Sequence, residues 1–253
     1  MKMSGNTILI TGGGSGIGRA LAEMFHRKGN TVIIAGRNQE KLAEVTTANK
    51  GIKSHVLDIN NVASIKDFVS VVTKEHSSLN VVIHNAGIMK PEIVGDGDSS
   101  IAEDIIITNL LGQIRLNSAI LMQLKAQVSG TIITVSSGLA FLPRFDFPTY
   151  CATKAAIHSY TQSLREQLRS TNIAVIELIP PYVQTELTGP EQTNDLRAMP
   201  LTDFIQEVTT ILETNPDARE IIVERVLFQR TAESSGEYDE RYEQFQKRFL
   251  NSN

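Results

Sequence analysis

A run of small residues, Thr11-Gly12-Gly13-Gly14-Ser15-Gly16-Ile17-Gly18, decides how this chain folds. It follows an apolar stretch directly and leads at once into a segment of helical periodicity. Glycines at such a place turn the backbone sharply and let a pyrophosphate approach the amides at the positive end of the helix. We therefore predict a loop that binds the phosphates of a dinucleotide, with a merely flexible turn as the alternative.

The residues of this loop exclude the Walker motif, which binds the phosphates of ATP or GTP. Gly13 and Gly18 have the Walker spacing, but Arg19 and Ala20 follow where that motif needs Lys and then Ser or Thr. Hydrolysis of ATP or GTP is therefore not expected. The literal dinucleotide fingerprint GxGxxG is absent too, and the spacing present over residues 12–18 is GxxxGxG.

Outward from the loop, short runs rich in Ile and Val alternate with longer helical segments. That alternation predicts an α/β, doubly wound Rossmann-type fold, in which a seven-stranded parallel sheet is flanked by helices on both faces. The expected strands are Asn6–Thr11, Thr31–Ala35, Lys53–Leu57, Leu79–His84, Gly130–Ser136, Ile173–Ile179 and Glu220–Glu224. The expected helices cover residues 17–28, 39–49, 62–76, 100–126, 150–169 and 201–214.

No repeat, Pro/Ser linker or block of like charge divides the chain. We therefore expect one dinucleotide-binding domain over residues 1–253, with a C-terminal helical extension at about 236–250. In that extension four aromatic residues recur at spacings of four, three and four: Tyr238, Tyr242, Phe245 and Phe249. We interpret this stripe mainly as a docking face, with direct contact to a ligand as the alternative.

Composition excludes several classes of partner. Lys and Arg number 24 against 28 Asp and Glu, and the net charge of -4 gives no reason to expect nucleic acid or an anionic membrane as a partner. The one cysteine, Cys151, cannot form an internal disulfide or a zinc site. No window approaches the roughly 18 consecutive apolar residues of a membrane helix, and no signal peptide is visible. We expect a cytoplasmic protein whose chemistry requires no metal.

The residue after the second expected strand indicates which nucleotide binds. An acidic side chain at this place, about 20 residues past the glycines, would hold the ribose hydroxyls of NAD. This chain has Gly36 and Arg37 instead, and a guanidinium can pair with the 2′-phosphate of NADP. We predict NADP rather than NAD, with a solvated surface charge as the alternative interpretation of Arg37.

Tyr150 and Lys154 lie four residues apart on an expected helix, so they share a face. A phenol with a pKa of about 10 exchanges protons poorly at neutral pH, and a neighbouring ammonium stabilises the phenolate and lowers that pKa. Such a pair arises by chance roughly 0.2 times in a chain of this composition, so its surroundings matter. Ser137 closes the strand-like run ITVSS, at the edge where open α/β sheets bind ligands.

Together these motifs resemble the short-chain dehydrogenase/reductase family, in its single-domain branch. The GxxxGxG loop is followed in family order by VLDI with Asp58, by Asn85-Ala86-Gly87, by TNLLG with Asn109, and by Ser137 at 13 residues before Tyr150. The segments PTYCATKAAIHSYTQSLREQL and ELIPPYVQTEL are similar to the bacterial DltE-type oxidoreductases of that family.

The resemblance implies a catalytic tetrad and a set of cofactor contacts. In the tetrad Tyr150 exchanges the proton, Lys154 holds the ribose and lowers the pKa of the tyrosine, Ser137 binds the substrate oxygen, and Asn109 seats a water. The implied cofactor contacts are Gly12, Ser15, Gly16, Ile17, Gly18, Arg37, Asp58, Ile59, Asn85, Ala86, Gly87, Tyr150, Lys154, Pro180, Val183 and Thr185.

Two positions depart from the family pattern. His84 replaces the first asparagine of NNAG, and we interpret it as a buried, hydrogen-bonded histidine rather than a catalytic one. Pro181 replaces the glycine of Pro-Gly after the sixth strand, so the loop beside the nicotinamide is expected to run differently. Cys151, next to Tyr150, is most simply a small buried thiol.

The predicted function is that of an NADP-dependent carbonyl reductase or alcohol dehydrogenase acting on a small molecule, with Tyr150 as acid and base. The alternative is a dinucleotide-binding sensor or scaffold with little chemistry, which the intact tetrad disfavours. A serine hydrolase fits less well, because the chain has no Gly-x-Ser-x-Gly elbow.

Two further expectations concern assembly and access to the site. Apolar residues crowd more than one face of segment 100–126, which together with segment 150–169 predicts a homodimer or homotetramer. Residues 184–200 form a predicted loop that carries apolar Leu187, Leu196 and Met199. We predict a lid that closes over the nicotinamide and residues 141–147, against the alternative of a static connection. The aromatic residues there favour a mainly apolar carbonyl substrate, unless Arg144 and Asp146 face it.

Overall fold

The computed structural model describes residues 1–250 and places seven strands in one parallel sheet, in the order β3-β2-β1-β4-β5-β6-β7. The strands are β1 (Thr7–Thr11), β2 (Thr31–Gly36), β3 (Lys53–Val56), β4 (Leu79–His84), β5 (Gly130–Val135), β6 (Ile173–Ile179) and β7 (Glu220–Ile222). The chain moves outward from β1 to β3 and then crosses back to β4. The loops after β1 and β4 therefore lead to opposite sides and leave a crevice at the carboxyl edge of the sheet.

Nine helices are described within residues 1–250: α1 (Gly16–Arg27), α2 (Gln39–Ala48), α3 (Val62–Glu75), α4 (Ser100–Ile106), α5 (Gly112–Lys125), α6 (Pro148–Gln167), α7 (Leu201–Thr214), α8 (Leu227–Arg230) and α9 (Tyr238–Leu250). A π-helical turn, η2 (Ile107–Leu111), joins α4 to α5. Short 3-10 turns are η1 (Val94–Asp96), η3 (Gly138–Ala140), η4 (Pro190–Asn194) and η5 (Glu224–Val226).

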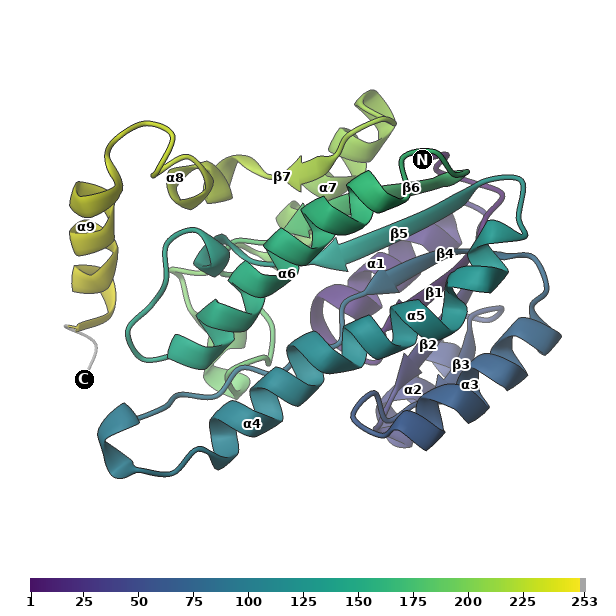
Figure 1. Ribbon diagram of the computed structural model, residues 1–253, viewed down its shortest axis with the longest axis horizontal. Coiled ribbons are helices and arrows are strands. Elements are labelled where there is room, and N and C mark those ends of the chain that lie inside the picture. Colours follow the sequence, from purple (N-terminus) through teal and green to yellow (C-terminus); the bar gives the residue numbers. More distant parts are fainter. Residues whose placement is uncertain (251–253) are drawn as a thin grey trace.

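Helices cover both faces of the sheet (Figure 1), because alternate residues of each strand point to opposite sides. On one face Ile8 and Ile10 pack with residues of α1, α2 and α7. On the other face Leu9 packs with residues of α3, α5 and α6. The seven-stranded, doubly wound Rossmann-type fold predicted from the sequence is therefore confirmed.

A third apolar cluster lies beyond the carboxyl ends of the strands, at the end of the molecule toward which the arrows of Figure 1 point. Helix α9 contributes Phe245 to this cluster, and its other aromatic residues pack against it. Tyr150 and Cys151 from the start of α6 belong to the same cluster. The aromatic stripe thus docks as predicted, and Gln246 of the same helix bonds to the Phe145 N–H and the Pro143 carbonyl in the loop before α6.

The predicted elements need small corrections at their ends. β7 ends at Ile222 rather than Glu224, and Ser136 lies just past β5. α6 begins at Pro148, two residues before its predicted start, because a proline in the first helical turn loses no hydrogen bond. The C-terminal helix begins at Tyr238, after Gly236 with φ of +73°. α8, four residues long, is not among the predicted helices.

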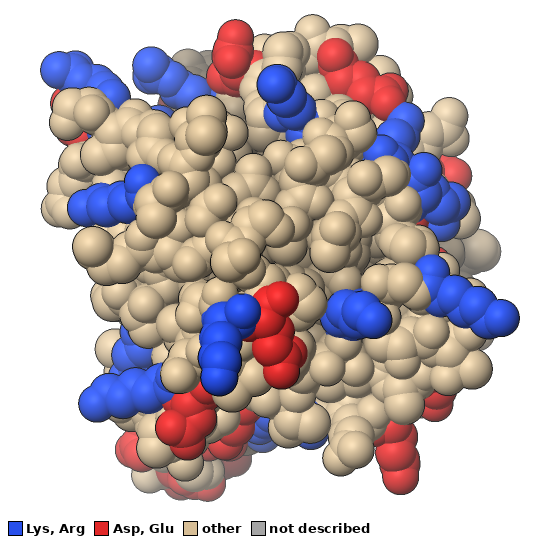
Figure 2. Space-filling view, turned by 90° about the vertical axis from the view of Figure 1, so that its right-hand side faces the viewer, with Lys and Arg blue, Asp and Glu red and all other residues tan. Residues whose placement is uncertain are grey.

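The predicted single helix at 100–126 contains a π-helical turn, and Asn109 lies in the middle of that turn. The segment Ser100–Lys125 is long and apolar enough to cross a membrane by length and composition, but 44% of its most apolar window is buried inside the molecule. A buried core helix passes the same test, so this is weak evidence for a membrane span. Figure 2 shows one face of the protein, on which both signs of charge are interspersed, in keeping with the small net charge.

Close packing of the glycine loop generates a stability prediction. A side chain at Gly18 would collide with the carbonyl oxygen of Gly12 and the side-chain amide of Asn85. Gly18→Ala should therefore destabilise the protein by about 1–3 kcal/mol, seen as a lower Tm in calorimetry. Gly95→Ala is the control, since an added side chain there meets nothing within 4 Å. Equal Tm values for the two variants would contradict this packing.

Candidate active site

One cavity of about 960 Å³ occupies the carboxyl edge of the sheet. It extends from the glycine loop to the start of α6, and α9 contributes to its wall. The structure brings together in it fourteen of the implied site residues, from the ends of five strands and from α6. They are Gly12, Ser15, Gly16, Ile17, Arg37, Asn85, Ala86, Gly87, Ser137, Tyr150, Lys154, Pro180, Val183 and Thr185.

The glycine loop presents open backbone to this cavity. Gly12 and Gly16 have φ values of +68° and +51°, which L side chains rarely adopt. Among residues 1–250 no side chain caps the first amides of α1, whereas Asn38 and Asn61 cap α2 and α3. Uncapped amides at a helix N-terminus bind anions. The loop therefore fits the pyrophosphate of a dinucleotide.

Thr11 and Asn85 join the glycine loop to the loop after β4. The Thr11 hydroxyl accepts the backbone N–H groups of Asn85 and Ala86, both at 3.0 Å. The Asn85 side-chain amide donates to the Thr11 carbonyl at 3.0 Å. Asn85 thus holds two cavity-lining loops together through its side chain.

Tyr150 and Lys154 are both buried at the end of the cavity nearest α9. Burial raises the pKa of the Tyr150 phenol, and the Ser137 hydroxyl acts in the opposite direction. The Lys154 ammonium lies 5.5 Å from the centre of the Tyr150 ring and donates to the Val135 carbonyl at 2.8 Å. The pKa of Tyr150 is therefore raised on balance rather than lowered, because desolvation outweighs the other influences on the phenol, and a lowering of this pKa by Lys154 stays a prediction.

Asn109 is fully buried behind the cavity and does not line it. Its side-chain amide donates to the Ile88 carbonyl at 2.9 Å, and its side-chain oxygen accepts the Ile88 N–H at 2.8 Å. Both polar atoms of the side chain are therefore engaged by the segment that follows Gly87. Asn109 fixes one wall of the cavity, and seating a water by this side chain has no support in these contacts.

Three implied cofactor residues lie outside the cavity lining. Gly18 packs beneath the loop, against Gly12. The Asp58 carboxylate accepts the Asn60 N–H at 3.0 Å, as part of the turn before α3. Ile59 is buried and close to Gly112, on the other side of that turn. Contacts of Asp58 and Ile59 with the adenine end of a cofactor stay predictions.

The two departures from the family pattern and the cysteine have structural explanations. His84 is buried as predicted, and the Asn117 side chain is the hydrogen-bonding group beside its ring, although neither ring nitrogen makes a bond of good geometry within residues 1–250. Burial lowers the pKa of His84 to about 4, with Asn117 opposing it, which keeps the ring neutral. Burial raises the pKa of the Cys151 thiol to about 11, as suits an inert packing group. Pro181 lines the cavity beside Pro180.

Most of the far wall of the cavity was not predicted from the sequence, which suggested only Arg144 and, as an alternative, the aromatic stripe. This wall combines aromatic rings, guanidinium groups and one amide, from Arg144, Arg197, Arg225, Phe228, Gln229, Phe245, Arg248 and Phe249. The Arg144 guanidinium lies 3.7 Å from the centre of the Phe249 ring and pairs with Asp146. The aromatic stripe was the available signal, and its last two rings, Phe245 and Phe249, combine docking with a place in the cavity wall.

Residues 184–200 are tied down at their base. Met199 donates its N–H to the Tyr182 carbonyl and accepts the Gln184 N–H, both at 2.8 Å. The Met199 side chain is also buried, so in this structure it belongs to the base of the loop rather than to its exposed apolar residues. Leu196 is 92% exposed and Leu187 is 42% exposed, so the apolar side chains available to close over a ligand are these two. A lid made of the remaining loop stays a prediction.

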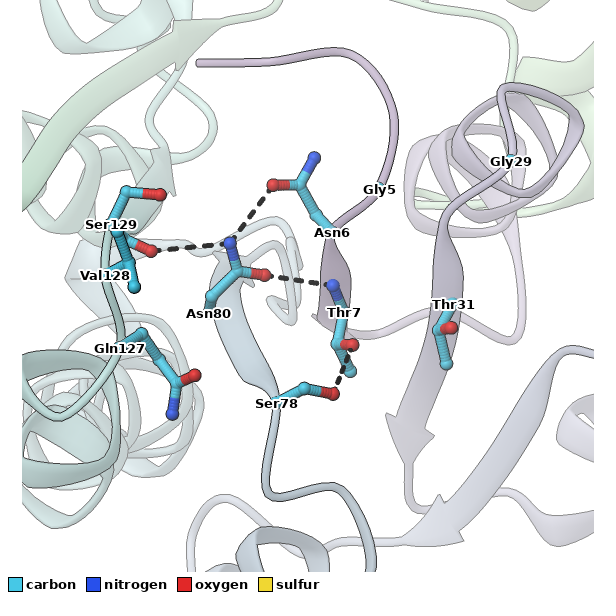
Figure 3. A pocket seen from close by; sticks show the side chains of 10 residues that line it. All are labelled: Gly5, Asn6, Thr7, Gly29, Thr31, Ser78, Asn80, Gln127, Val128 and Ser129. Carbon is cyan, nitrogen blue, oxygen red and sulfur yellow. Dashed lines mark hydrogen bonds between the residues drawn. The ribbon is translucent and has the colours of Figure 1, made fainter.

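A second, shallower hollow of about 350 Å³ lies at the opposite, amino edge of the sheet (Figure 3). The side chains around it bind one another there. Asn80 accepts the Thr7 N–H at 2.9 Å and donates to Asn6 at 3.1 Å. Thr7 and Ser78 share a hydrogen bond of 2.9 Å between their hydroxyls. These hydrogen bonds join the starts of β1 and β4. The polar side chains at this hollow therefore have a structural role.

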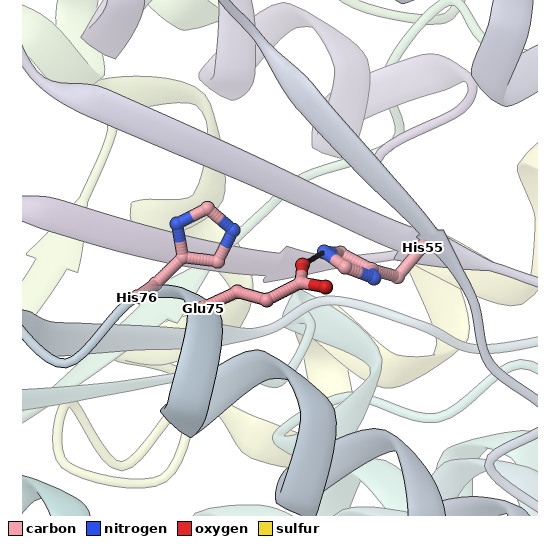
Figure 4. Close-up of side chains that lie close together, drawn as sticks. All are labelled: His55, Glu75 and His76. Carbon is pink, nitrogen blue, oxygen red and sulfur yellow. Dashed lines mark ion pairs between the residues drawn. The ribbon is translucent and has the colours of Figure 1, made fainter.

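Two groups of His and Glu side chains also gather outside the cavity. His55, Glu75 and His76 meet at the ends of β3 and α3 (Figure 4), where His55 Nε2 lies 3.6 Å from a Glu75 oxygen. The other group is His158, Glu177 and Glu220, in which both Glu220 oxygens bind Arg230 at 3.0 Å. Neither group touches the cavity.

Comparison with known proteins places this site in a family. The sequence profile described as short chain dehydrogenase matches residues 6–196. The uncharacterized oxidoreductase DltE of Bacillus subtilis (strain 168) is 36% identical over 255 residues, which cover 96% of this chain and 98% of that protein. A solved short-chain dehydrogenase/reductase from Burkholderia phymatum, in complex with NAD, has a TM-score of 0.80 at 18% identity, over 94% of this chain and 96% of its own.

A second solved structure, a short chain dehydrogenase from Burkholderia cenocepacia J2315 in complex with NADP, has a TM-score of 0.78 at 23% identity, over 93% of this chain and 96% of its own. At these identities the two structures support the fold alone. The family assignment rests on the sequence profile and on the similarity to DltE. The chain therefore belongs to the short-chain dehydrogenase/reductase family of NAD(P)-dependent oxidoreductases, and it is of the DltE type.

Proposed function

We propose that this protein is an NADP-dependent oxidoreductase that interconverts a carbonyl compound and an alcohol, with Tyr150 as acid and base. The observation that carries the proposal is a single cavity that contains both the open amides of the glycine loop and the side chains of Ser137, Tyr150 and Lys154. A dinucleotide held by the glycine loop and by residues 85–87 would supply the hydride through its nicotinamide.

The chain's own residues provide the proton and the orientation. The raised pKa keeps the Tyr150 phenol protonated, so it can donate a proton to a carbonyl oxygen during reduction. The Ser137 hydroxyl, beside that phenol, can bind the same oxygen and hold it in line. The Lys154 ammonium stabilises the phenolate that remains after the transfer.

A panel of aldehydes, ketones and alcohols tests this proposal, with NADPH or NADP absorbance as the readout. Turnover of at least one compound, proportional to the protein concentration, is the expected result. Tight binding of NADPH without turnover of any compound would instead favour the sensor or scaffold alternative.

Replacing Tyr150 tests the proposed proton donor. Tyr150→Phe removes the hydroxyl and keeps the ring, so kcat should fall by about 10² to 10⁴-fold while the affinity for NADPH stays within about twofold. Tyr160→Phe is the matched control, because that hydroxyl bonds to Asn117 outside the cavity. A Tyr150→Phe enzyme with wild-type turnover would assign the proton to another group.

The preference for NADP is supported by Arg37. It follows β2 directly and lines the cavity, in a sequence, Gly36-Arg37-Asn38, that offers no carboxylate to repel a phosphate. Lys41 lines the cavity close by and pairs with Glu186 at 2.8 Å. Two cationic side chains thus border the part of the cavity next to the glycine loop.

Reversing the charge at Arg37 tests this preference. Arg37→Asp should weaken NADPH binding at least tenfold relative to NADH, measured by the fluorescence of each reduced cofactor. Arg27→Asp makes the same change of charge at the exposed end of α1 and should leave the ratio unchanged. Wild-type protein that binds NADH as tightly as NADPH would refute the preference.

Assembly into a dimer or tetramer is supported by the outer surfaces of α4, α5 and α6. Ile106, Leu111 and Met122 are 39%, 37% and 72% exposed, although all three are apolar. The exposed face of α6 carries the small residues Ala152, Ala155 and Ser159. Such surfaces pack well against a second copy across a twofold axis.

Light scattering after size exclusion measures the assembly directly. At micromolar concentration the mass should be two or four times 27.8 kDa. Leu111→Glu should shift the protein toward the monomer, whereas Val94→Glu, at a residue 82% exposed and outside these helices, should not. A wild-type monomer at this concentration would refute the assembly.

The substrate is proposed from the far wall of the cavity. The rings of Phe228, Phe245 and Phe249 suit an apolar body, while Arg144 and Arg225 on the same wall suit an anionic group. We therefore propose a carbonyl substrate that combines the two, in place of the mainly apolar one predicted.

A matched pair of aldehydes tests the anionic group. 4-Formylbenzoate should be reduced with at least tenfold higher kcat/KM than its methyl ester, and Arg225→Gln should reduce that ratio. The ester makes its aldehyde the more electrophilic of the two, so a preference for the carboxylate must come from binding, and its loss in Arg225→Gln assigns that binding to the guanidinium. A kcat/KM for the ester equal to or above that for 4-formylbenzoate, unchanged in Arg225→Gln, would contradict selection by charge.

A further inference from the structure

A buried carboxylate on β6, Glu177, has no part in the reaction described so far. Its side chain is fully buried, and its two oxygens lie 2.8 and 3.0 Å from His158 Nδ1. An ionised carboxylate in a protein interior is costly unless positive charge compensates it there. His158 and Glu177 each lie in one of the two sequence segments that resemble the DltE-type oxidoreductases.

The Lys154 ammonium lies in the same interior space. Lys154 is one helical turn before His158 on α6, so the two side chains leave the same face. The ammonium donates to the carbonyl of Val135, and the residue before it, Thr134, is the neighbour of Glu177 across the sheet. The space between α6 and strands β5 and β6 therefore holds a buried cation and a buried anion.

These two charges influence each other. Burial lowers the pKa of Lys154 to about 8, and the charge of Glu177 acts against that lowering. Two other ionisable groups share this face of α6: Tyr150, whose ring centre is 5.5 Å from the ammonium, and His158, whose ring is bonded to Glu177 itself. A neutral phenol supplies no counter-charge, so Glu177 is the anion that supports the lysine.

The remaining charged groups around this space are engaged by other partners. Glu220, which neighbours Glu177 on β7, binds Arg230 through both oxygens. Arg165 of α6 donates to two backbone carbonyls, those of residues 175 and 219, at 2.9 Å. Glu220 therefore does not replace Glu177 as the anion near Lys154, and Arg165 does not replace Lys154 as the cation near Glu177.

His158 holds the carboxylate in this position. Its ring bonds to Glu177 on one side and lies edge-on to the Phe141 ring, 4.7 Å between centres. The Arg230 guanidinium covers the same Phe141 ring at 4.7 Å, which links the contact to α8. The imidazole is thus fixed by packing, and it shields the carboxylate from solvent.

We propose that Glu177, held by His158, is a positioning residue that keeps the Lys154 ammonium charged in its buried site. Its consequence for catalysis rests on the function proposed above, in which a charged Lys154 stabilises the Tyr150 phenolate. The effect of Glu177 on the pKa of Lys154 does not depend on that function. This pKa can be measured in the protein without substrate or cofactor.

The direct test is the titration of Lys154 by NMR in protein labelled with [6-¹³C]lysine, with Lys154→Met for assignment. The wild-type signal should titrate near pH 8. Glu177→Gln keeps the shape and the hydrogen bond to His158 but removes the charge, so it should lower that midpoint by at least about one pH unit. Glu220→Gln is the matched control, because it removes a charge from the neighbouring strand position, and should leave the midpoint within about 0.3 unit.

A Glu177→Gln midpoint equal to that of the wild type would overturn the proposal. If this variant does not fold, the ionisation of Glu177 is measured instead in wild-type protein labelled with [5-¹³C]glutamate and assigned through the backbone. The proposal requires a charged carboxylate wherever Lys154 is charged, and a neutral Glu177 beside a charged Lys154 would overturn it equally.

The pH dependence of turnover separates this proposal from the proposed function. With any active substrate, the high-pH fall of kcat should move down with the lysine midpoint, and a shift of one unit would lower kcat about threefold at pH 7.5. A shifted NMR midpoint with an unshifted kcat profile would retain Glu177 as the support of Lys154 and reject the assigned role of Lys154. An unshifted midpoint would reject the role of Glu177 alone.

Discussion

The contact between the glycine loop and the loop after β4 is the constraint on which the site depends. The strand order reverses between β1 and β4, so these two loops separate and leave the crevice in which ligands of such sheets bind. Thr11 and Asn85 hold the loops at a fixed spacing, and the glycine at position 18 allows the helix to approach that closely. The open amides of α1 and the wall of the cavity are consequences of this one junction.

Burial controls the chemistry at the other end of the cavity. The same desolvation raises the pKa of Tyr150 and lowers that of Lys154, so it opposes the charged form of each group. In the proposed reduction the protonated phenol is the acid, whereas the lysine has to be kept charged against its surroundings. Glu177 on β6 is held by His158 on α6. In our proposal this contact lets a strand of the sheet help to keep Lys154 charged.

The sequence predicted the sheet and its helices, and most of the site residues that it implied line the cavity, because runs of Ile and Val and the spacing of glycines report local structure. Apart from Arg144, it did not predict the far wall, since α9 returns to the cavity from the end of the chain and that return depends on tertiary packing. The pKa of Tyr150 was expected to be lowered, but burial raises it. The spacing of Tyr150 and Lys154 shows that the two are neighbours, but it does not show how deeply the phenol is buried. Asn109 was placed correctly on a helix. The π-helical turn around it and its two hydrogen bonds to Ile88 have no sequence pattern from which they could be predicted.

In the proposed enzyme the amides of α1 and the Tyr150–Lys154 pair belong to one site, and a crystal structure of the protein grown with NADP would show whether a dinucleotide joins them. Continuous density through the cavity is expected, with phosphates against residues 15–17 and the nicotinamide end beside Tyr150. Well-ordered crystals in which the dinucleotide lies elsewhere, or in which its density ends at the glycine loop while α9 fills the rest of the cavity, would contradict it.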